Sequence, residues 1–192
     1  MPGDKNGTHT PKWKVSIRSC FQQRCKTTMP DTREVRMSPI GLVRTNASQT
    51  EVRDGRRGLI SKIEIFPQFE EALDGLEGFS HIFVIAWFNQ LREEQIGPLR
   101  VRPRRLLRYG LTLEELPLVG VFGLDSPTRP NPLGLSLVPL LRREGRRLIV
   151  SELDYFDRTP VLDIKPYNSG YRVGRYRVPD WHERLAKKAG RV

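Results

Sequence analysis

The chain has 192 residues, of which 38% are hydrophobic and 29% are charged, a composition that predicts one domain with a buried core. The net charge of +11 indicates a polyanionic partner, with nucleic acid favoured over a membrane surface. No apolar run approaches the roughly 20 residues that a bilayer-spanning helix needs, and the N-terminus lacks a secretory signal pattern. Two cysteines are too few for a disulfide scaffold, which favours a cytoplasmic protein.

The excess of positive charge is concentrated at the two ends of the chain. Residues 1–37 and residues 171–192 each carry a net charge of +5, whereas residues 38–170 carry +1. We interpret residues 1–37 as a flexible basic extension, because they are polar and show no sustained hydrophobic period. Its two cysteines, Cys20 and Cys25, are interpreted as free thiols rather than as a metal or redox site.

The segment between the two ends has the pattern of a mostly β domain. Residues 59–65 alternate, with Ser61, Ile63 and Ile65 on one face, which predicts a half-buried strand. Residues 79–88 are too apolar for an exposed strand and predict a central one. Further strands are predicted at 39–43, 118–122, 135–140, 148–153 and 161–164, with a polar loop at 46–57, a helical turn at 68–73 and a hairpin turn at 142–146. Many short strands between glycines and prolines predict a single compact β-barrel with short helices.

The basic C-terminal segment, residues 171–192, contains a predicted short helix that Asp180 caps and that runs to Ala189.

Cofactor and metal motifs are absent from the sequence. There is no G-x-G-x-x-G after a strand, no P-loop and no H-E-x-x-H. The three histidines, His9, His81 and His182, are too scattered along the chain to predict a metal site.

Residues 120–136, with the sequence GVFGLDSPTRPNPLGLS, form the most informative stretch. Their three prolines fix φ and restrict the preceding residues, so the loop is stiff. A stiff loop that presents Asp125, Arg129 and Asn131 is suited to hold a ligand, because a preorganised site loses less entropy on binding. A rigid corner of the barrel explains the prolines equally well, and both interpretations stay open at this point.

A second stretch, residues 154–167, places Asp163 and Lys165 on one face of a strand, with Leu162 and Ile164 on the other. This pair is either a surface ion pair of little energetic value or an acid and a base at a ligand site.

The two stretches together carry a resemblance. The sequence R-P-N-P-L-G-L-S after G-V-F, followed by T-P-V-L-D-I-K-P-Y, resembles the TsaA/YaeB (TrmO-like) family over about residues 38–168, with supporting matches at 40–44, 75–81 and 101–103. The resemblance implies a small β-barrel methyltransferase that uses S-adenosylmethionine (SAM) without a Rossmann fold. It also implies a homodimer with the cofactor near the subunit interface. The implied substrate is tRNA, methylated on N6 of threonylcarbamoyladenosine next to the anticodon.

The resemblance and the proline-rich loop give one set of candidate cofactor contacts. These are Arg53, Asp54, Asn89, Gln90, Asp125, Arg129, Asn131, Leu135, Ser151, Glu152, Leu153 and Asp154. Two positions depart from the family pattern, since many members have Thr-Arg at Leu124-Asp125 and most have histidine at Asn89. A carboxylate at position 125 suits the cationic sulfonium or the ribose hydroxyls, whereas an arginine suits a carboxylate or a phosphate.

Methyl transfer from a sulfonium is an in-line displacement, so the enzyme must hold the nucleophile and the methyl group in alignment. The N6 nitrogen of the implied substrate is urea-like and poorly nucleophilic, so a base that removes its proton would help. Asp163 and Asp154 are the candidate bases, with Lys165 beside Asp163.

Several residues are candidates for binding the substrate. Lys165 and Arg129 would hold the threonyl carboxylate or a phosphate, and Tyr167 offers a stacking surface for an unpaired base. An arginine cluster between the central strand and the proline-rich loop includes Arg102, Arg104 and Arg105, which we expect to contact the tRNA backbone.

Two alternative functions stay open. The Leu124-Asp125 departure is compatible with a methyltransferase of the same fold that acts on a different substrate. The basic ends and the arginine cluster are also compatible with an RNA-binding barrel that has no catalytic activity.

Overall fold

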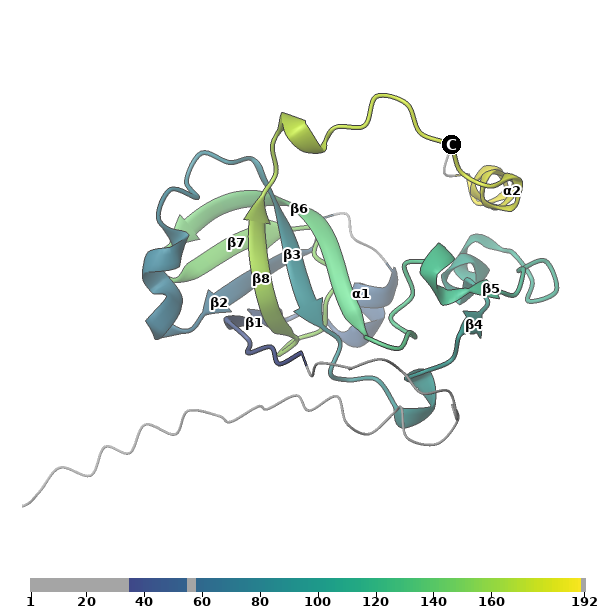
Figure 1. The fold of residues 1–192 in the computed structure, drawn as a ribbon, viewed down its shortest axis with the longest axis horizontal. Coiled ribbons are helices and arrows are strands. Elements are labelled where there is room, and N and C mark those ends of the chain that lie inside the picture. Colours follow the sequence, from purple (N-terminus) through teal and green to yellow (C-terminus); the bar gives the residue numbers. More distant parts are fainter. Residues whose placement is uncertain (1–34, 55–57, 191–192) are drawn as a thin grey trace, which may run out of the picture.

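The computed structural model describes residues 35–54 and 58–190 (Figure 1). The expected basic extension, with Cys20 and Cys25, lies almost entirely outside the described residues, so its flexibility stays a prediction. Within the described part of the chain, no helix is long and apolar enough to cross a membrane.

Six strands close into an antiparallel barrel in the order β1-β2-β7-β6-β3-β8. The barrel strands are β1 (Gly41–Arg44), β2 (Ile60–Ile65), β3 (His81–Trp87), β6 (Leu133–Glu144), β7 (Arg147–Ser151) and β8 (Pro160–Pro166). β8 pairs with both β3 and β1, which closes the sheet on itself. The predicted mostly β barrel is therefore confirmed, and closure leaves the barrel no free strand edge.

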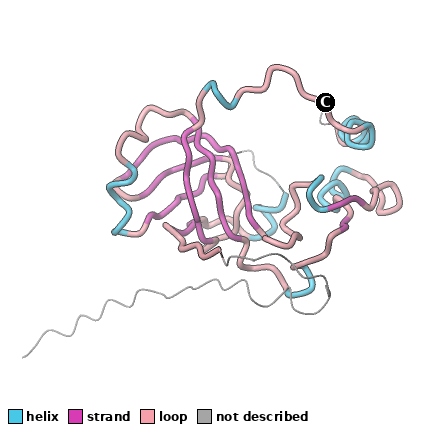
Figure 2. Tube along the Cα trace, viewed as in Figure 1, coloured by secondary structure: helices cyan, strands magenta, loops and turns pink. Residues whose placement is uncertain are grey.

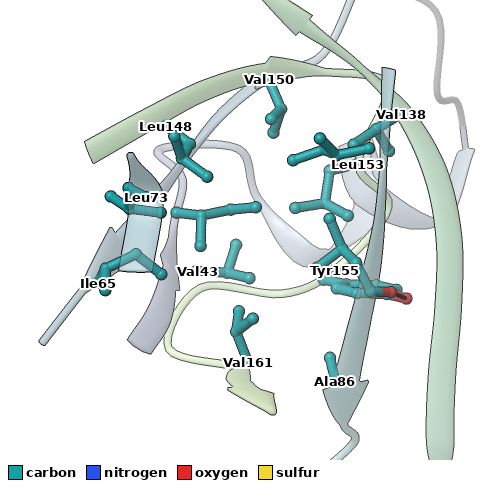
Figure 3. Close-up of a cluster of buried hydrophobic side chains, with 13 residues drawn as sticks. Val43, Ile65, Leu73, Ala86, Val138, Leu148, Val150, Leu153, Tyr155 and Val161 are labelled. Atoms are coloured by element: carbon teal, nitrogen blue, oxygen red, sulfur yellow. Dashed lines mark hydrogen bonds between the residues drawn. The ribbon is translucent and has the colours of Figure 1, made fainter. Parts of the chain in front are cut away.

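Alternation along the strands fills the barrel interior. Ser61, Ile63 and Ile65 of β2 share one face, as predicted, and this face points inward, since each is at most 1% exposed. The central strand β3 buries alternate residues in the same way. The core cluster contains the inward side chains of all six strands together with residues of the β2–β3 and β7–β8 connections (Figure 3).

The connection between β7 and β8 contributes two of these core side chains. Leu153 is fully buried and Tyr155 is 2% exposed. The Tyr155 hydroxyl donates a hydrogen bond of 3.3 Å to the carbonyl of Val84. Glu152 and Arg158 flank this segment with φ near +63°, a region that residues other than glycine rarely occupy. The connection is thus held across one end of the barrel in a specific, locally strained path.

A small module, called the side module here, lies beside the barrel (Figures 1 and 2). It contains the two-stranded sheet of β4 (Arg100–Val101) and β5 (Val119–Gly120), the 3₁₀ helix η4 (Arg104–Tyr109) and the C-terminal helix α2 (Asp180–Lys188). Leu111, Leu116, Leu185 and Ala189 form its own buried cluster. An ion pair of 2.6 Å between Lys188 and Glu115 fastens α2 to the module.

The remaining described elements are short helices. They are α1 (Gln49–Asp54) and the 3₁₀ helices η2 (Pro67–Leu73), η3 (Glu93–Gln95), η5 (Val121–Gly123) and η6 (Ser169–Tyr171). The predicted helical turn at 68–73 corresponds to η2, and the predicted hairpin turn corresponds to the β6–β7 connection around Gly145, where φ is +59°.

Three local predictions were wrong. The polar loop predicted at 46–57 contains α1, which Ser48 and Glu51 cap reciprocally through hydrogen bonds of 2.7 and 3.2 Å. The strand predicted at 118–122 is only the two-residue β5, which pairs with β4 outside the barrel and leads into η5. The N-cap of α2 is Pro179 rather than Asp180, which is the first residue of the helix.

Candidate active site

One end of the barrel, called the barrel mouth here, lies where β3 and β7 end and β6 and β8 begin. A backbone hydrogen bond of 2.8 Å from Phe88 to Pro132 ties the end of β3 to the proline-rich loop. Another of 2.8 Å from Glu152 to Leu59 ties the end of β7 to the start of β2. Most of the candidate cofactor contacts belong to the segments that meet at this end.

Asp154 is the ionisable group that these segments hold most closely. Its side chain is only 12% exposed, and one carboxylate oxygen pairs with Nη1 of Arg105 at 3.0 Å. The other carboxylate oxygen lies 3.4 Å from the hydroxyl of Ser136, which β6 points into the barrel. A carboxylate beside the barrel interior, held from two different elements, is positioned to accept a proton or to face a cation.

The helix α1 also reaches the barrel mouth. The guanidinium of Arg53 lies 5.4 Å from the centroid of the Phe156 ring, a cation–π contact. Arg108 of η4 donates a hydrogen bond to the backbone carbonyl of Arg53. The side module therefore contacts the mouth twice, through Arg105 at Asp154 and through Arg108 at α1. Asp54, another candidate cofactor contact, is the last residue of α1.

The end of β3 brings Asn89 and Gln90 to the same region. The Gln90 side chain donates a hydrogen bond of 2.7 Å to the carbonyl of Asp157. The Asp157 carboxylate in turn accepts one of 3.1 Å from the backbone of Thr45. Asn89 is exposed, so it is accessible to a ligand.

The proline-rich loop is stiffened from within. Nη2 of Arg129 donates to the carbonyls of Val121 at 3.0 Å and Leu124 at 2.5 Å. Its Nε is buried without a hydrogen-bond partner among the described residues. Asp125 and Asn131 are exposed. Arg129 therefore supports the shape of the loop, whereas Asp125 and Asn131 are polar side chains that the loop presents to solvent.

Gly134 marks the closest packing at the mouth. A Cβ atom there would lie 2.5 Å from Cζ of Phe88 and 2.8 Å from the hydroxyl of Tyr155, distances that no side chain accepts without a shift. The following residue, Leu135, points to the outside of the barrel and is 68% exposed.

Asp163 and Lys165 lie elsewhere, on the outer face of β8, and form an ion pair of 2.9 Å. The hydrogen bond that Lys165 donates to Asp163 raises the pKa of Lys165. Ile85 lies between Asp163 and Leu135 across the sheet, so Asp163 shares the outer face with Leu135. The Tyr167 ring stacks against Tyr171 at 6.1 Å on this face.

Most side chains of the arginine cluster are engaged by other residues of the chain, two within the side module and two at the barrel mouth. Arg100 donates to the carbonyl of Leu118, Arg102 donates to that of Leu116, and Arg105 and Arg108 make the contacts described above. The side chain of Arg104 is exposed and makes no hydrogen bond or ion pair with another described residue.

Ser136 and Phe156 are functional candidates that the sequence analysis missed. The alternation of β6 could have identified Ser136, because it places Ser136 between Gly134 and Val138 on the inward face. A buried hydroxyl must find a polar partner. Phe156 had no comparable signal. Within residues 35–54 and 58–190, no group of three or more histidines, cysteines and acids could hold a metal ion.

Comparison with known proteins gives the family. The family model described as the tRNA-methyltransferase O N-terminal domain matches residues 46–171. The chain belongs to this family. The match includes the barrel mouth and the side module up to β5, and it ends before α2.

Relatives and solved structures agree with this assignment. A protein of Methanothermobacter thermautotrophicus named "Probable S-adenosyl-L-methionine-binding protein" is 42% identical over 70% of this chain and 90% of its own length. An "S-adenosyl-L-methionine-binding protein" of Archaeoglobus fulgidus is 37% identical over 69% of this chain and 88% of its own length. A crystal structure of TrmO from Pseudomonas aeruginosa superposes with a TM-score of 0.58 at 30% identity over 77% of this chain. Another TrmO crystal structure superposes with a TM-score of 0.59 at 32% identity over 76% of this chain. This chain spans 62% and 64% of those two TrmO chains, respectively.

Proposed function

We propose that this protein binds SAM at the barrel mouth and methylates N6 of threonylcarbamoyladenosine in tRNA. The observation that carries the proposal is Asp154, held between Ser136 and Arg105 where the candidate cofactor segments converge. Membership of the tRNA-methyltransferase O family and the names of the relatives as SAM-binding proteins support the reaction class.

The residues at the mouth suit this cofactor. The exposed side chains of Asp125, Asn89 and Asn131 offer hydrogen-bond acceptors for ribose hydroxyls or an ammonium group. The carboxylates of Asp125 and Asp154 suit a cationic sulfonium. When bound, SAM supplies an electrophilic methyl group.

Asp154 would accept the N6 proton at the carboxylate oxygen that faces Ser136, since the other oxygen is engaged by Arg105. Arg105 has further N–H donors, which would hold the threonyl carboxylate of the substrate. Asp154 and Arg105 would then stand side by side as a base and an anion-binding group. The substrate needs both, because its urea-like N6 must lose a proton and its threonyl carboxylate must be held in place. A tRNA substrate would place the protein in the cytoplasm.

The same proposal includes a homodimer formed through the outer face of β6, β3 and β8. Leu135, Leu137 and Tyr171 are 68%, 42% and 49% exposed there. Exposed apolar groups on one sheet face favour burial against a second copy. Leu137→Glu should convert the protein to a monomer in analytical ultracentrifugation, whereas Ile60→Glu, at a 58% exposed position of β2, should leave a dimer. A monomeric parent protein would contradict the dimer.

Isothermal titration calorimetry with S-adenosylhomocysteine, the product of the cofactor, tests the site. The parent protein should bind it, and Asp154→Asn should weaken tRNA methylation far more than Asp163→Asn, since Asp163 is engaged by Lys165 on the outer face. No binding at millimolar ligand would refute the cofactor assignment. Equal loss of methylation in both variants would refute Asp154 as the base.

A second candidate substrate follows from the exposed Asp125, where many members of the family have arginine. A carboxylate at this position repels phosphates and carboxylates, so a less anionic methyl acceptor than threonylcarbamoyladenosine is the alternative. Restoration of arginine by Asp125→Arg distinguishes the two: the alternative predicts that only this variant methylates threonylcarbamoyladenosine.

A further inference from the structure

The outer surface of β1, β2, β7 and β6 carries a group of cations that extends from the end of β1 to the hairpin turn between β6 and β7, at the opposite end of the barrel from the mouth. The strand register places Arg44, Lys62, Ile149 and Arg142 in one row across the four strands. The neighbouring row contains Leu42, Glu64, Arg147 and Glu144. With Arg146 from the hairpin turn, we call this surface the basic face; its charged members are Arg44, Lys62, Arg142, Arg146, Arg147, Glu64 and Glu144, with a net charge of +3.

Two cations of the basic face oppose each other directly. Arg44 of β1 and Lys62 of β2 are cross-strand partners, and both are exposed. Like charges at directly opposed positions destabilise a sheet. Arg44 is bonded to Glu64, whereas Lys62 has no ion pair with another described residue, so Lys62 is the cation of this pair that a ligand would compensate.

Glu64 gathers three guanidiniums at one point of the face. Its carboxylate lies 3.0 Å from Nε of Arg44, 3.3 Å from Nη2 of Arg146 and 3.8 Å from Nε of Arg147. The hydrogen bond from Arg44 lowers the pKa of Glu64, which keeps the carboxylate ionised. Three guanidiniums carry more N–H donors than one carboxylate can accept, so Glu64 orients the arginines without using up their capacity for anions.

One arginine close to the basic face is engaged by acidic groups that follow η2. Arg143, beside Arg142 in sequence, pairs with Asp74 at 3.0 Å and Glu77 at 2.6 Å and is only 16% exposed. It therefore belongs to the acidic side of the barrel. By contrast, Arg44, Arg142 and Arg147 are 44%, 60% and 52% exposed, so their head groups are accessible to a ligand.

We propose that the basic face binds backbone phosphates of the RNA substrate, outside the active site. The inference rests on the proposed function for the identity of the RNA. An RNA strand presents a row of phosphates with a fixed negative charge, which matches a row of cations with spare donors. The substrate would then contact the protein at two places, with the target base at the mouth and a neighbouring part of the backbone along β2.

Binding of an unmodified tRNA transcript, followed by fluorescence anisotropy over a series of KCl concentrations, tests the proposal. The variants are Lys62→Gln and the triple variant Arg44→Gln, Lys62→Gln, Arg147→Gln. The control is Arg92→Gln, which removes an even more exposed arginine, at the N-cap of η3, that is paired with Glu94. Each lost phosphate contact lowers the slope of log K against log salt concentration by about 0.7–0.9.

We expect the slope to fall by about 2–3 in the triple variant and by about 1 in Lys62→Gln, with an affinity loss on the order of tenfold or more in the triple variant near 0.1 M salt. The melting temperature of Lys62→Gln should equal or exceed that of the parent, because the opposed like charges are removed. Parental slopes in the triple variant, or an equal fall in the Arg92→Gln control, would overturn the proposal. S-adenosylhomocysteine calorimetry on the same samples tests the active site separately, so either assignment can fail while the other stands.

Discussion

Replacing Gly134 with alanine tests whether the barrel mouth is packed as closely as the geometry indicates. The backbone at Gly134 does not have a positive φ, so an alanine is excluded by space and not by conformation. The new methyl group would lie 2.5 Å from the Phe88 ring and 2.8 Å from the Tyr155 hydroxyl. These two rings pack edge to face with centroids 5.2 Å apart, so neither can move without disturbing the other.

The expected cost follows from these contacts. Overpacking a close-packed core by one methyl group costs about 1–3 kcal/mol. Displacing Tyr155 also breaks its hydrogen bond to Val84, which adds about 1 kcal/mol. The reduced entropy of the unfolded chain offsets about 0.4–1 kcal/mol. We therefore expect Gly134→Ala to lower the free energy of unfolding by about 1–3 kcal/mol, with weaker binding of S-adenosylhomocysteine because Asp154 adjoins Tyr155.

Urea unfolding followed by tryptophan fluorescence measures this cost. Gly174→Ala is the matched control, because a Cβ atom there meets nothing within 4 Å and φ is not positive. The control should be as stable as the parent or slightly more stable. If Gly134→Ala unfolds at the same urea concentration as Gly174→Ala, the close packing of the mouth is refuted.

Three further predictions concern the core, the acid stability and the N-terminal extension. Leu153→Ala should lower the free energy of unfolding by about 2–5 kcal/mol, because Leu153 is fully buried; a loss below 1 kcal/mol would be inconsistent with its burial. The hydrogen bond from Arg44 holds the pKa of Glu64 below its usual value, so the unfolded chain binds more protons as the pH falls and stability is lost on acidification. Glu64→Gln should make this loss between about pH 5 and 3 shallower, and an unchanged profile in thermal unfolding would contradict it. Deletion of residues 1–37 should weaken tRNA binding and flatten its salt dependence while leaving S-adenosylhomocysteine affinity intact, and loss of cofactor affinity in calorimetry would contradict the role assigned to this segment.

The barrel strands could be predicted because their signal is local. The alternation of Ser61, Ile63 and Ile65 reports one buried face directly, and β2 shows this pattern. The capping pair Ser48 and Glu51 is equally local, and α1 was missed only because the segment is polar. The strand predicted at 118–122 failed for a different reason, since only Val119 and Gly120 pair, with β4 outside the barrel, while Leu118 and Phe122 are exposed.

The candidate site could be predicted only in part. The motifs marked the segments that meet at the barrel mouth, including Ser151 to Asp154, but not which side chains face one another. Arg105 and Ser136 are 49 and 18 residues from Asp154 in the chain, and only closure of the barrel brings them together. The sequence grouped Asp163 with Asp154 as candidate bases, whereas the register of β8 places Asp163 on the outer face with Lys165.

The central claim is that this barrel transfers a methyl group from SAM to threonylcarbamoyladenosine in tRNA. The most direct test incubates the full chain with tRNA that contains this nucleoside and with SAM labelled by a trideuterated methyl group, followed by mass spectrometry of the nucleosides. The account predicts that the threonylcarbamoyladenosine signal gains one labelled methyl group, and that Asp154→Asn abolishes most of this gain. An unchanged nucleoside from a protein that binds S-adenosylhomocysteine would contradict the proposed substrate.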